Sequence, residues 1–147
     1  MTRMFTPLAA LAFVLSAAAA SSPALAGDPT GLWLTEDGDA RVRIAACGAA
    51  ICGTIAWLKD PNDKETGKPK LDKNNANAAQ RTRPIIGVPI VLSMKPDGND
   101  KWSGQIYNAE DGKTYSGSLT LASANSIKLQ GCVASIFCKT KSWTRTN

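Results

Sequence analysis

The chain has 147 residues and a formal net charge of +5, with 44% hydrophobic residues, 20% charged residues, four cysteines and no histidine. The missing histidine excludes Ser-His-Asp and Cys-His catalysis, histidine-ligated haem and histidine-based zinc sites. The length suits one domain, and the charged fraction is too ordinary for a disordered chain. We therefore expect one folded domain with no cofactor and no metal.

The first 26 residues have the pattern of a secretory signal peptide. Arg3 gives a positive start, an apolar stretch runs from Leu8 to Ala20, and Ala24-Leu25-Ala26 is a small-x-small cleavage motif. Serines and Pro23 interrupt the apolar stretch early, so we expect no stable membrane anchor. We predict a periplasmic or secreted protein whose mature domain spans 27–147.

The mature domain is expected to be mildly basic. Of 17 basic residues, removal of Arg3 leaves 16 against 12 acidic residues, a charge of +4. The lysines are scattered along the chain, which favours a solvated surface over a binding patch. We expect no nucleic-acid partner, and the sequence leaves the oligomeric state open.

Short alternating or apolar runs separated by turn residues make up most of the mature chain, a pattern typical of β-strands. Eight runs are predicted strands: 31–35, 40–46, 52–58, 88–94, 102–107, 114–121, 126–133 and 136–145. Short turns rich in Gly, Asn and Asp join most of them as hairpins. We predict an all-β fold, an antiparallel up-and-down eight-stranded barrel, because closure removes the exposed edges of an open sheet. Side chains either fill such an interior or leave room for one small ligand, and the sequence leaves this choice open.

One long connection, 59–87, interrupts the series of hairpins. It is polar, contains three prolines and exceeds the usual loop length. A short helix is predicted over 76–81, with caps offered by 72–75 and a stop at Pro84. The segment is either a lid at the barrel mouth or a plain solvated loop.

The four cysteines are predicted to form two structural disulfides, as is usual in exported proteins. Spacing favours local links, Cys47 to Cys52 and Cys132 to Cys138, because each pair flanks a predicted turn. A redox thiol and a four-cysteine zinc site are the alternatives, and neither spacing fits them well.

The first of these links also predicts a register for its hairpin. If its two cysteines lie directly opposite each other, Ile44 faces Ile55 and Val42 faces Trp57. That register gathers the apolar side chains, including Trp57, on one face of the sheet.

Several motifs follow one another along the mature chain: Gly31-x-Trp33, Cys47-Gly-Ala-Ala-Ile-Cys52-Gly-x-Ile-x-Trp57-Leu58, Gly67-x-Pro69-x-x-Asp72-x-x-Asn75, Arg81-x-Arg83-Pro84, Trp102-x-Gly104-x-Ile106-Tyr107, Asp111-Gly112-Lys113-Thr114-Tyr115 and the ending Gly131-Cys132 … Cys138 … Trp143-Thr144-Arg145. With these motifs in this order, the chain resembles the bacterial secreted family catalogued as domain of unknown function 2147. The resemblance implies no particular activity.

A second similarity is architectural. Gly31 and Trp33 in the first strand, with Arg145 at the end of the last, resemble the lipocalin and calycin signature. The resemblance implies that the arginine packs across the tryptophan and closes one barrel end, a contact that combines cation–π attraction with aromatic burial. By analogy it also implies a ligand-binding barrel.

Two groups of side chains are candidate ligand contacts. The long connection carries Asp72, Asn75, Arg81 and Arg83, which either form an anion-binding lid or cap the short helix and pin the loop internally. The aromatic group comprises Trp57, Trp102, Trp143, Tyr107 and Tyr115. The tyrosines are expected to face each other across their hairpin, and the tryptophans to fill the core or line a cavity.

These features favour a binding protein over an enzyme. We predict a small apolar or amphipathic ligand inside the barrel, entering beneath 59–87, with aromatic walls and an arginine meeting any acidic head group. The alternatives are a protein-binding module, such as an inhibitor of an envelope hydrolase, and a histidine-free enzyme.

Overall fold

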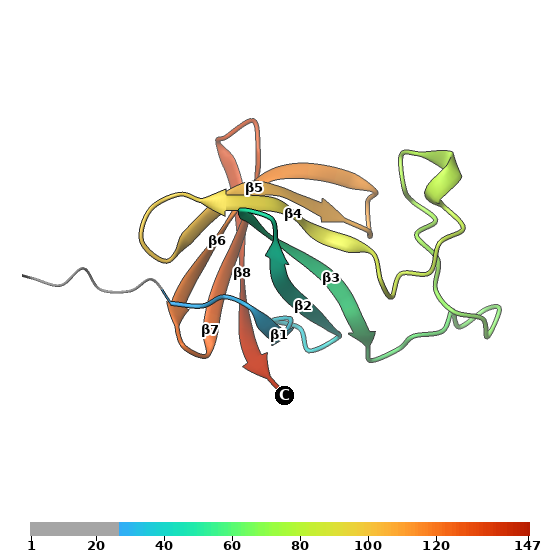
Figure 1. Cartoon of the computed structure of the whole chain (residues 1–147). Coiled ribbons are helices and arrows are strands. Elements are labelled where there is room, and N and C mark those ends of the chain that lie inside the picture. Colours follow the sequence, from blue (N-terminus) through green and yellow to red (C-terminus); the bar gives the residue numbers. More distant parts are fainter. Residues whose placement is uncertain (1–26) are drawn as a thin grey trace, which may run out of the picture.

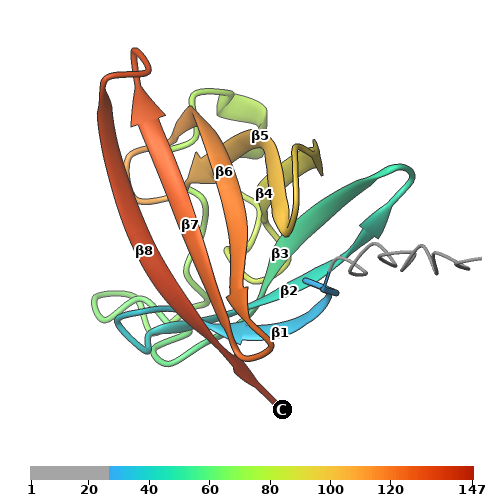
Figure 2. The same ribbon diagram turned by 90° about the vertical axis from the view of Figure 1, so that its left-hand side faces the viewer.

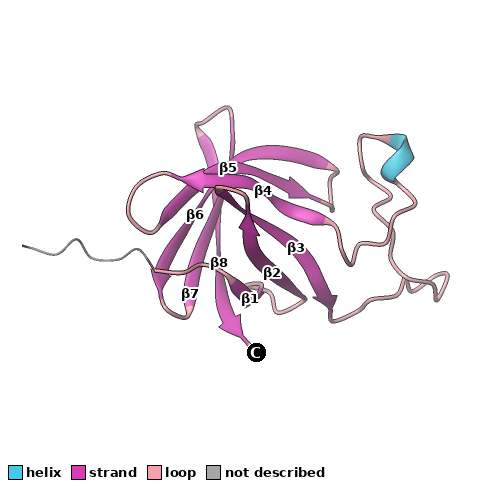
Figure 3. Cartoon of the chain, viewed as in Figure 1, coloured by secondary structure: helices cyan, strands magenta, loops and turns pink. Residues whose placement is uncertain are grey.

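The computed structural model describes residues 27–147, which contain eight strands and one short 3-10 helix. The strands are β1 (Gly31–Leu34), β2 (Ala40–Cys47), β3 (Ala50–Leu58), β4 (Pro89–Pro96), β5 (Lys101–Asn108), β6 (Lys113–Ser123), β7 (Ser126–Val133) and β8 (Phe137–Thr146). The helix is η1 (Ala78–Gln80) (Figure 3). The predicted signal peptide lies outside the described residues.

Each strand pairs antiparallel with the next, and β8 returns to pair with β1, so the sheet closes into a barrel (Figures 1 and 2). The prediction of an eight-stranded antiparallel up-and-down barrel is confirmed. Closure satisfies the backbone groups that an open sheet of this size would leave at its edges. Within residues 27–147, no helix has the length and apolar character needed to cross a membrane.

Alternation along the strands gives the barrel its inner and outer faces. On β2, Val42 and Ile44 are buried while Arg43 between them is exposed. The inward side chains form one cluster that fills part of the interior: Trp33, Val42, Ile44, Ile51, Val91, Met94, Trp102, Leu119, Ile127, Leu129 and Trp143. The barrel is therefore a packed core over much of its length rather than an open tube.

Arg145 closes one end of the barrel. Its guanidinium carbon lies 4.3 Å from the centre of the Trp33 ring, as the lipocalin resemblance implies. The same guanidinium donates hydrogen bonds to the backbone oxygens of Ala124, Thr30 and Asp28 at 2.6, 2.6 and 2.9 Å. One side chain thus ties β8 to the chain before β1 and to the turn between β6 and β7.

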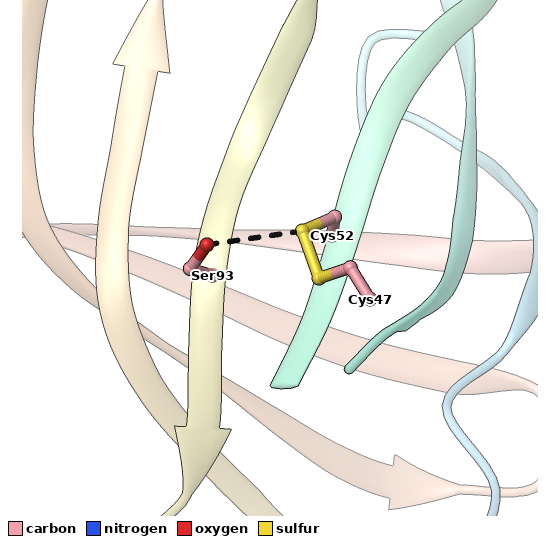
Figure 4. Close-up of a disulfide and its surroundings, with 3 residues drawn as sticks. All are labelled: Cys47, Cys52 and Ser93. Carbon is pink, nitrogen blue, oxygen red and sulfur yellow. Dashed lines mark hydrogen bonds between the residues drawn. A yellow bond between two sulfur atoms is a disulfide. The ribbon is translucent and has the colours of Figure 1, made fainter. Parts of the chain in front are cut away.

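The first disulfide joins Cys47 to Cys52 as predicted, but the predicted register is wrong by two residues. Cys47 pairs with Ala50 and Cys52 with Ala45, because a two-residue turn at 48–49 replaces the longer loop that opposed cysteines require. Figure 4 shows Ser93 of β4 pointing at Cys52, with its oxygen 4.0 Å from the sulfur. Since a disulfide sulfur carries no hydrogen, the serine hydroxyl is the donor.

A bulge in the same hairpin moves Trp57 to the outer face. Val42 faces Ile55, but Arg41, which precedes Val42 on β2, faces Trp57. Ala56 is therefore an extra residue on β3 with no partner on β2. Trp57 is 37% exposed, and the Arg41 guanidinium lies 4.8 Å from its ring centre. The prediction that Trp57 shares the inner face with Val42 is wrong for this reason.

The second disulfide, Cys132 to Cys138, joins residues that face each other directly across β7 and β8. It lies at the opposite end of the barrel from Arg145. At this end, which we call the mouth, lie the turns after β1, β5 and β7 and the long connection after β3.

Candidate ligand-binding site

Two adjoining hollows open at the mouth. Their volumes are about 430 and about 780 Å³. They have six lining residues in common: Thr35, Asp39, Ile90, Tyr107, Asn108 and Glu110. The smaller hollow lies between the barrel rim and the long connection, and the larger one extends toward the β7–β8 hairpin. Together they form one continuous concave site above the packed core, which we call the mouth site.

The floor of the mouth site is apolar. Ile55 and Leu58 line the smaller hollow, and Ile106, Leu129 and Trp143 line the larger one. Trp143 and Leu129 are also members of the core cluster. The upper surface of the packed core is thus the floor of the site.

Charged side chains of both signs surround this floor. The lining acids are Glu36, Asp37, Asp39, Asp63, Glu110 and Asp111, and the lining cations are Lys70, Lys73, Lys139 and Lys141. Lys141 forms salt bridges of 3.3 Å to Glu36 and 3.0 Å to Asp37, which join β8 to the turn after β1. An apolar floor inside a charged rim suits an amphipathic molecule.

A buried carboxylate anchors the long connection against the barrel. Asp72 is 0% exposed. Its Oδ1 accepts a hydrogen bond of 2.6 Å from the Tyr107 hydroxyl. Its Oδ2 accepts from Asn75 at 2.8 Å and from Arg83 Nε at 2.9 Å, and the Arg83 Nη2 lies 2.8 Å away. A buried charge with this set of donors is satisfied, as burial requires.

The same contacts shift the pKa values of Asp72 and Tyr107. Burial alone would raise the pKa of Asp72, but the hydrogen bonds from Tyr107, Asn75 and Arg83, with the charge of Arg83, hold that pKa below its usual value. Burial and the nearby Asp72 carboxylate raise the pKa of Tyr107. Asp72 is therefore charged and Tyr107 neutral at physiological pH.

The rest of the connection is organised around Asn75. Its backbone oxygen accepts a 2.7 Å hydrogen bond from Arg81 Nε, and its side-chain oxygen accepts from the Asn77 amide at 2.8 Å. The helix is shorter than predicted, 78–80 rather than 76–81, and Asn77 is its N-cap. The prediction that 72–75 supplies the cap is wrong because Asp72 and Asn75 bond other partners.

The connection also contacts the turn after β5. Asn74 Nδ2 donates a 2.8 Å hydrogen bond to the backbone oxygen of Glu110. Gly112, with φ of 71°, lies so close that a β-carbon would come within 1.7 Å of the Asn74 oxygen. A glycine is required there both for the turn and for this close approach. The connection thus forms a fixed wall of the mouth site.

Few of the sequence-predicted ligand contacts lie at the mouth site. Tyr107 lines both hollows, and Tyr115 and Trp143 line the larger one. The two tyrosines do not face each other, since Tyr107 pairs with Thr114 and Tyr115 with Ile106. Six other candidates line neither hollow: Trp57, Asp72, Asn75, Trp102, Arg81 and Arg83. Trp102 is in the core cluster, and the four polar residues bond within the connection or to Tyr107.

Most of the floor and rim residues were not predicted from the sequence. Ile90 and Leu129 line the site but belong to no sequence motif, whereas Ile106 and Gly131 belong to motifs of the family resemblance but were not among the predicted ligand contacts. The available signal was positional: in an up-and-down barrel, inward-facing residues near the same end of successive strands share one cavity.

No group of three or more Cys, Asp or Glu side chains within 27–147 is arranged to hold a metal ion. The lining of the mouth site offers a ligand apolar contact, hydrogen bonds and side-chain charge.

A closed eight-stranded up-and-down barrel with an arginine over a first-strand tryptophan and a concave site at the other end is a lipocalin-like fold. Residues 31–145 match the family described as "Uncharacterized protein conserved in bacteria (DUF2147)", and the chain belongs to that family. No curated protein matches the chain.

The chain matches two solved structures. One is the protein HP1028 of Helicobacter pylori, described as belonging to the lipocalin family. It has a TM-score of 0.70 and 22% identity, covering 82% of this chain and 84% of that one. The other, a redesigned β-barrel, has a TM-score of 0.41 and 13% identity, covering 80% of this chain and 90% of that one. The first similarity supports the lipocalin-like fold.

Proposed function

We propose that this protein binds a small amphipathic molecule at the mouth site. The observation that carries the proposal is the continuous hollow above an apolar floor, with volumes of about 430 and about 780 Å³. Sites for small molecules typically have volumes of about 300–1,000 Å³ and mostly apolar linings. The lipocalin-like fold supports the same interpretation by analogy.

The rim suggests how the ligand is oriented. Its apolar part lies on Ile106, Leu129 and Trp143, and its polar head group stays at the charged rim. Arg81 and Arg83 are engaged by Asn75 and Asp72, so they do not serve as head-group partners. Rim lysines, rather than these arginines, meet an acidic head group in this proposal.

Export through a cleavable signal peptide remains part of the proposal. Two disulfides are compatible with an oxidising compartment outside the cytoplasm. The ligand is therefore a molecule that the protein meets in the periplasm or beyond the cell.

Filling the site with a side chain tests the proposal. Gly131 lines the larger hollow, and a β-carbon built there makes only ordinary contacts, 3.8 Å to Ile106 and 3.9 Å to Tyr115. We expect Gly131→Leu to fold normally and to weaken binding of a fluorescent amphipathic probe by about tenfold or more, because the new side chain occupies the ligand's volume.

Gln130→Leu is the matched control. Gln130 is exposed and neighbours Gly131 on β7 but does not line the hollow, so probe affinity should be unchanged. If Gly131→Leu and the parent protein bound the probe equally well, the proposed site would be contradicted. It would also be contradicted if the protein bound a protein partner and the probe did not compete with that partner.

A further inference from the structure

The tip of the β7–β8 hairpin carries the most exposed large apolar side chains of the described chain. Val133, Ile136 and Phe137 are 53%, 77% and 75% exposed. Pairing between β6 and β7 ends at Ser116 and Cys132, and Figure 2 shows the hairpin extending beyond β6. Exposed apolar groups gathered in this way mark interaction sites.

The tip is a tight turn closed by a disulfide. The Cys132–Cys138 disulfide crosses the hairpin directly below it. Ala134 and Ser135 have φ values of 51° and 59°, the left-handed conformation that suits the twist of a tight hairpin. On this closed hairpin the Ile136 and Phe137 side chains are exposed to solvent.

The inner face of this hairpin connects the tip with the mouth site. Three cross-strand pairs follow one another from tip to floor: Val133 with Phe137, Gly131 with Lys139, and Leu129 with Lys141. All six residues line the larger hollow. The tip is thus the outer edge of the ligand site rather than a separate patch.

The size and charge of the tip favour a lipid surface over a protein partner. Three side chains offer a few hundred Å² at most, below the roughly 800 Å² per partner of a stable protein interface. Lys139 lies next to the tip and forms no salt bridge within 27–147, whereas Lys141 is paired with acids. The apolar tip can contact the acyl chains of a bilayer, while the unpaired Lys139 can contact the anionic head groups above them.

We propose that the β7–β8 tip inserts into a lipid surface carrying anionic head groups. Ile136 and Phe137 enter the acyl region, and Lys139 meets the phosphates. Docking brings the mouth site to the membrane, so that a lipid-like ligand moves between bilayer and floor along the inner face of the hairpin. This transfer rests on the proposed function, whereas the docking itself does not.

Co-sedimentation of the processed, exported protein with vesicles of phosphatidylethanolamine and phosphatidylglycerol tests the docking. Ile136 lines neither hollow, so Ile136→Asp leaves the ligand site unchanged. We expect this substitution to weaken vesicle binding by about tenfold or more, since it removes an inserted apolar side chain and adds a charge. Ile86→Asp, at another exposed isoleucine outside both hollows, should bind vesicles like the parent.

The outcomes separate docking from ligand binding. Lost vesicle binding with unchanged affinity for the free fluorescent probe supports both proposals. Vesicle binding without any probe binding supports docking and overturns the transfer. Docking itself is overturned if Ile136→Asp and the parent bind vesicles equally, if neither binds, or if the substitution instead abolishes a dimer in solution.

Discussion

At the scale of single residues, the Asp72 carboxylate is the main polar contact between the long connection and the barrel. It receives hydrogen bonds from Tyr107 on β5 and from Asn75 and Arg83 within the connection. The oxygens of this buried group have partners on both sides of the contact, so its loss affects the wall and the barrel together.

We predict that Asp72→Asn destabilises the protein by about 2 kcal/mol. The amide removes the charge that Arg83 pairs with and one of the two acceptor oxygens, and Arg83 is partly exposed, which limits the cost. Urea unfolding measures the change. Asp111→Asn is the control: Asp111 accepts a hydrogen bond from Tyr115 in an exposed position, so it should cost less than about 1 kcal/mol. Equal effects of the two substitutions would contradict the anchoring role of Asp72.

The same group predicts a pH dependence. The folded pKa of Asp72 is below its unfolded value of about 4, so its stabilising contribution is complete above that pH and is lost as pH falls through the folded pKa. The raised pKa of Tyr107 acts at the other end, since its contribution is lost as pH rises above about 10. We expect Asp72→Asn to flatten the acid limb of the stability curve, measured by urea unfolding between about pH 2 and 6. If the variant lost stability at acid pH as steeply as the parent, other carboxyl groups rather than Asp72 would cause the pH dependence.

At the scale of elements, strand positions followed from sequence far better than strand registers. Alternation on β2 predicted its inward face correctly, because burial of every second residue leaves a direct trace in the sequence. The register of β2 against β3 depended on a two-residue turn and on a bulge at Ala56, and neither has an unambiguous sequence signal. Trp57 was misplaced through that bulge.

The candidate site was less predictable than the strands for a related reason. The internal alternative, in which an arginine pairs with Asp72 to pin the loop, agrees with the contact to Arg83, but the capping role expected of Asp72 and Asn75 does not occur. A further partner of Asp72, Tyr107, lies 35 residues away, and such a contact depends on how the long connection crosses the mouth. The residue pattern of a short sequence segment does not show how the long connection crosses the mouth.

A further prediction concerns the closed end of the barrel. Arg145→Lys keeps the charge but loses the planar fork that bonds three backbone oxygens and covers Trp33. We expect a loss of about 2 kcal/mol in the free energy of unfolding, measured by urea titration. Arg43→Lys, on the exposed face of β2, should change stability by less than about 0.5 kcal/mol. If both substitutions left the free energy of unfolding unchanged, the contact of Arg145 with Trp33 would not stabilise the closed end of the barrel.

At the scale of the whole molecule, the two ends of the barrel have different roles. A packed cluster and the Arg145 contact occupy one end, while the mouth has the fixed wall of the long connection, the apolar floor and the exposed hairpin tip. The question that the sequence left open, a filled or a hollow barrel, thus has a mixed answer. Side chains fill the interior up to Leu129 and Trp143, and the remaining space opens to the outside.

The central claim is that this remaining space holds a small amphipathic molecule. The most direct measurement is mass spectrometry of organic extracts from natively purified protein, comparing the parent with Gly131→Leu. The account predicts an amphipathic compound that co-purifies with the parent and with Gln130→Leu and is depleted in Gly131→Leu. Indistinguishable extracts from all three proteins would contradict it.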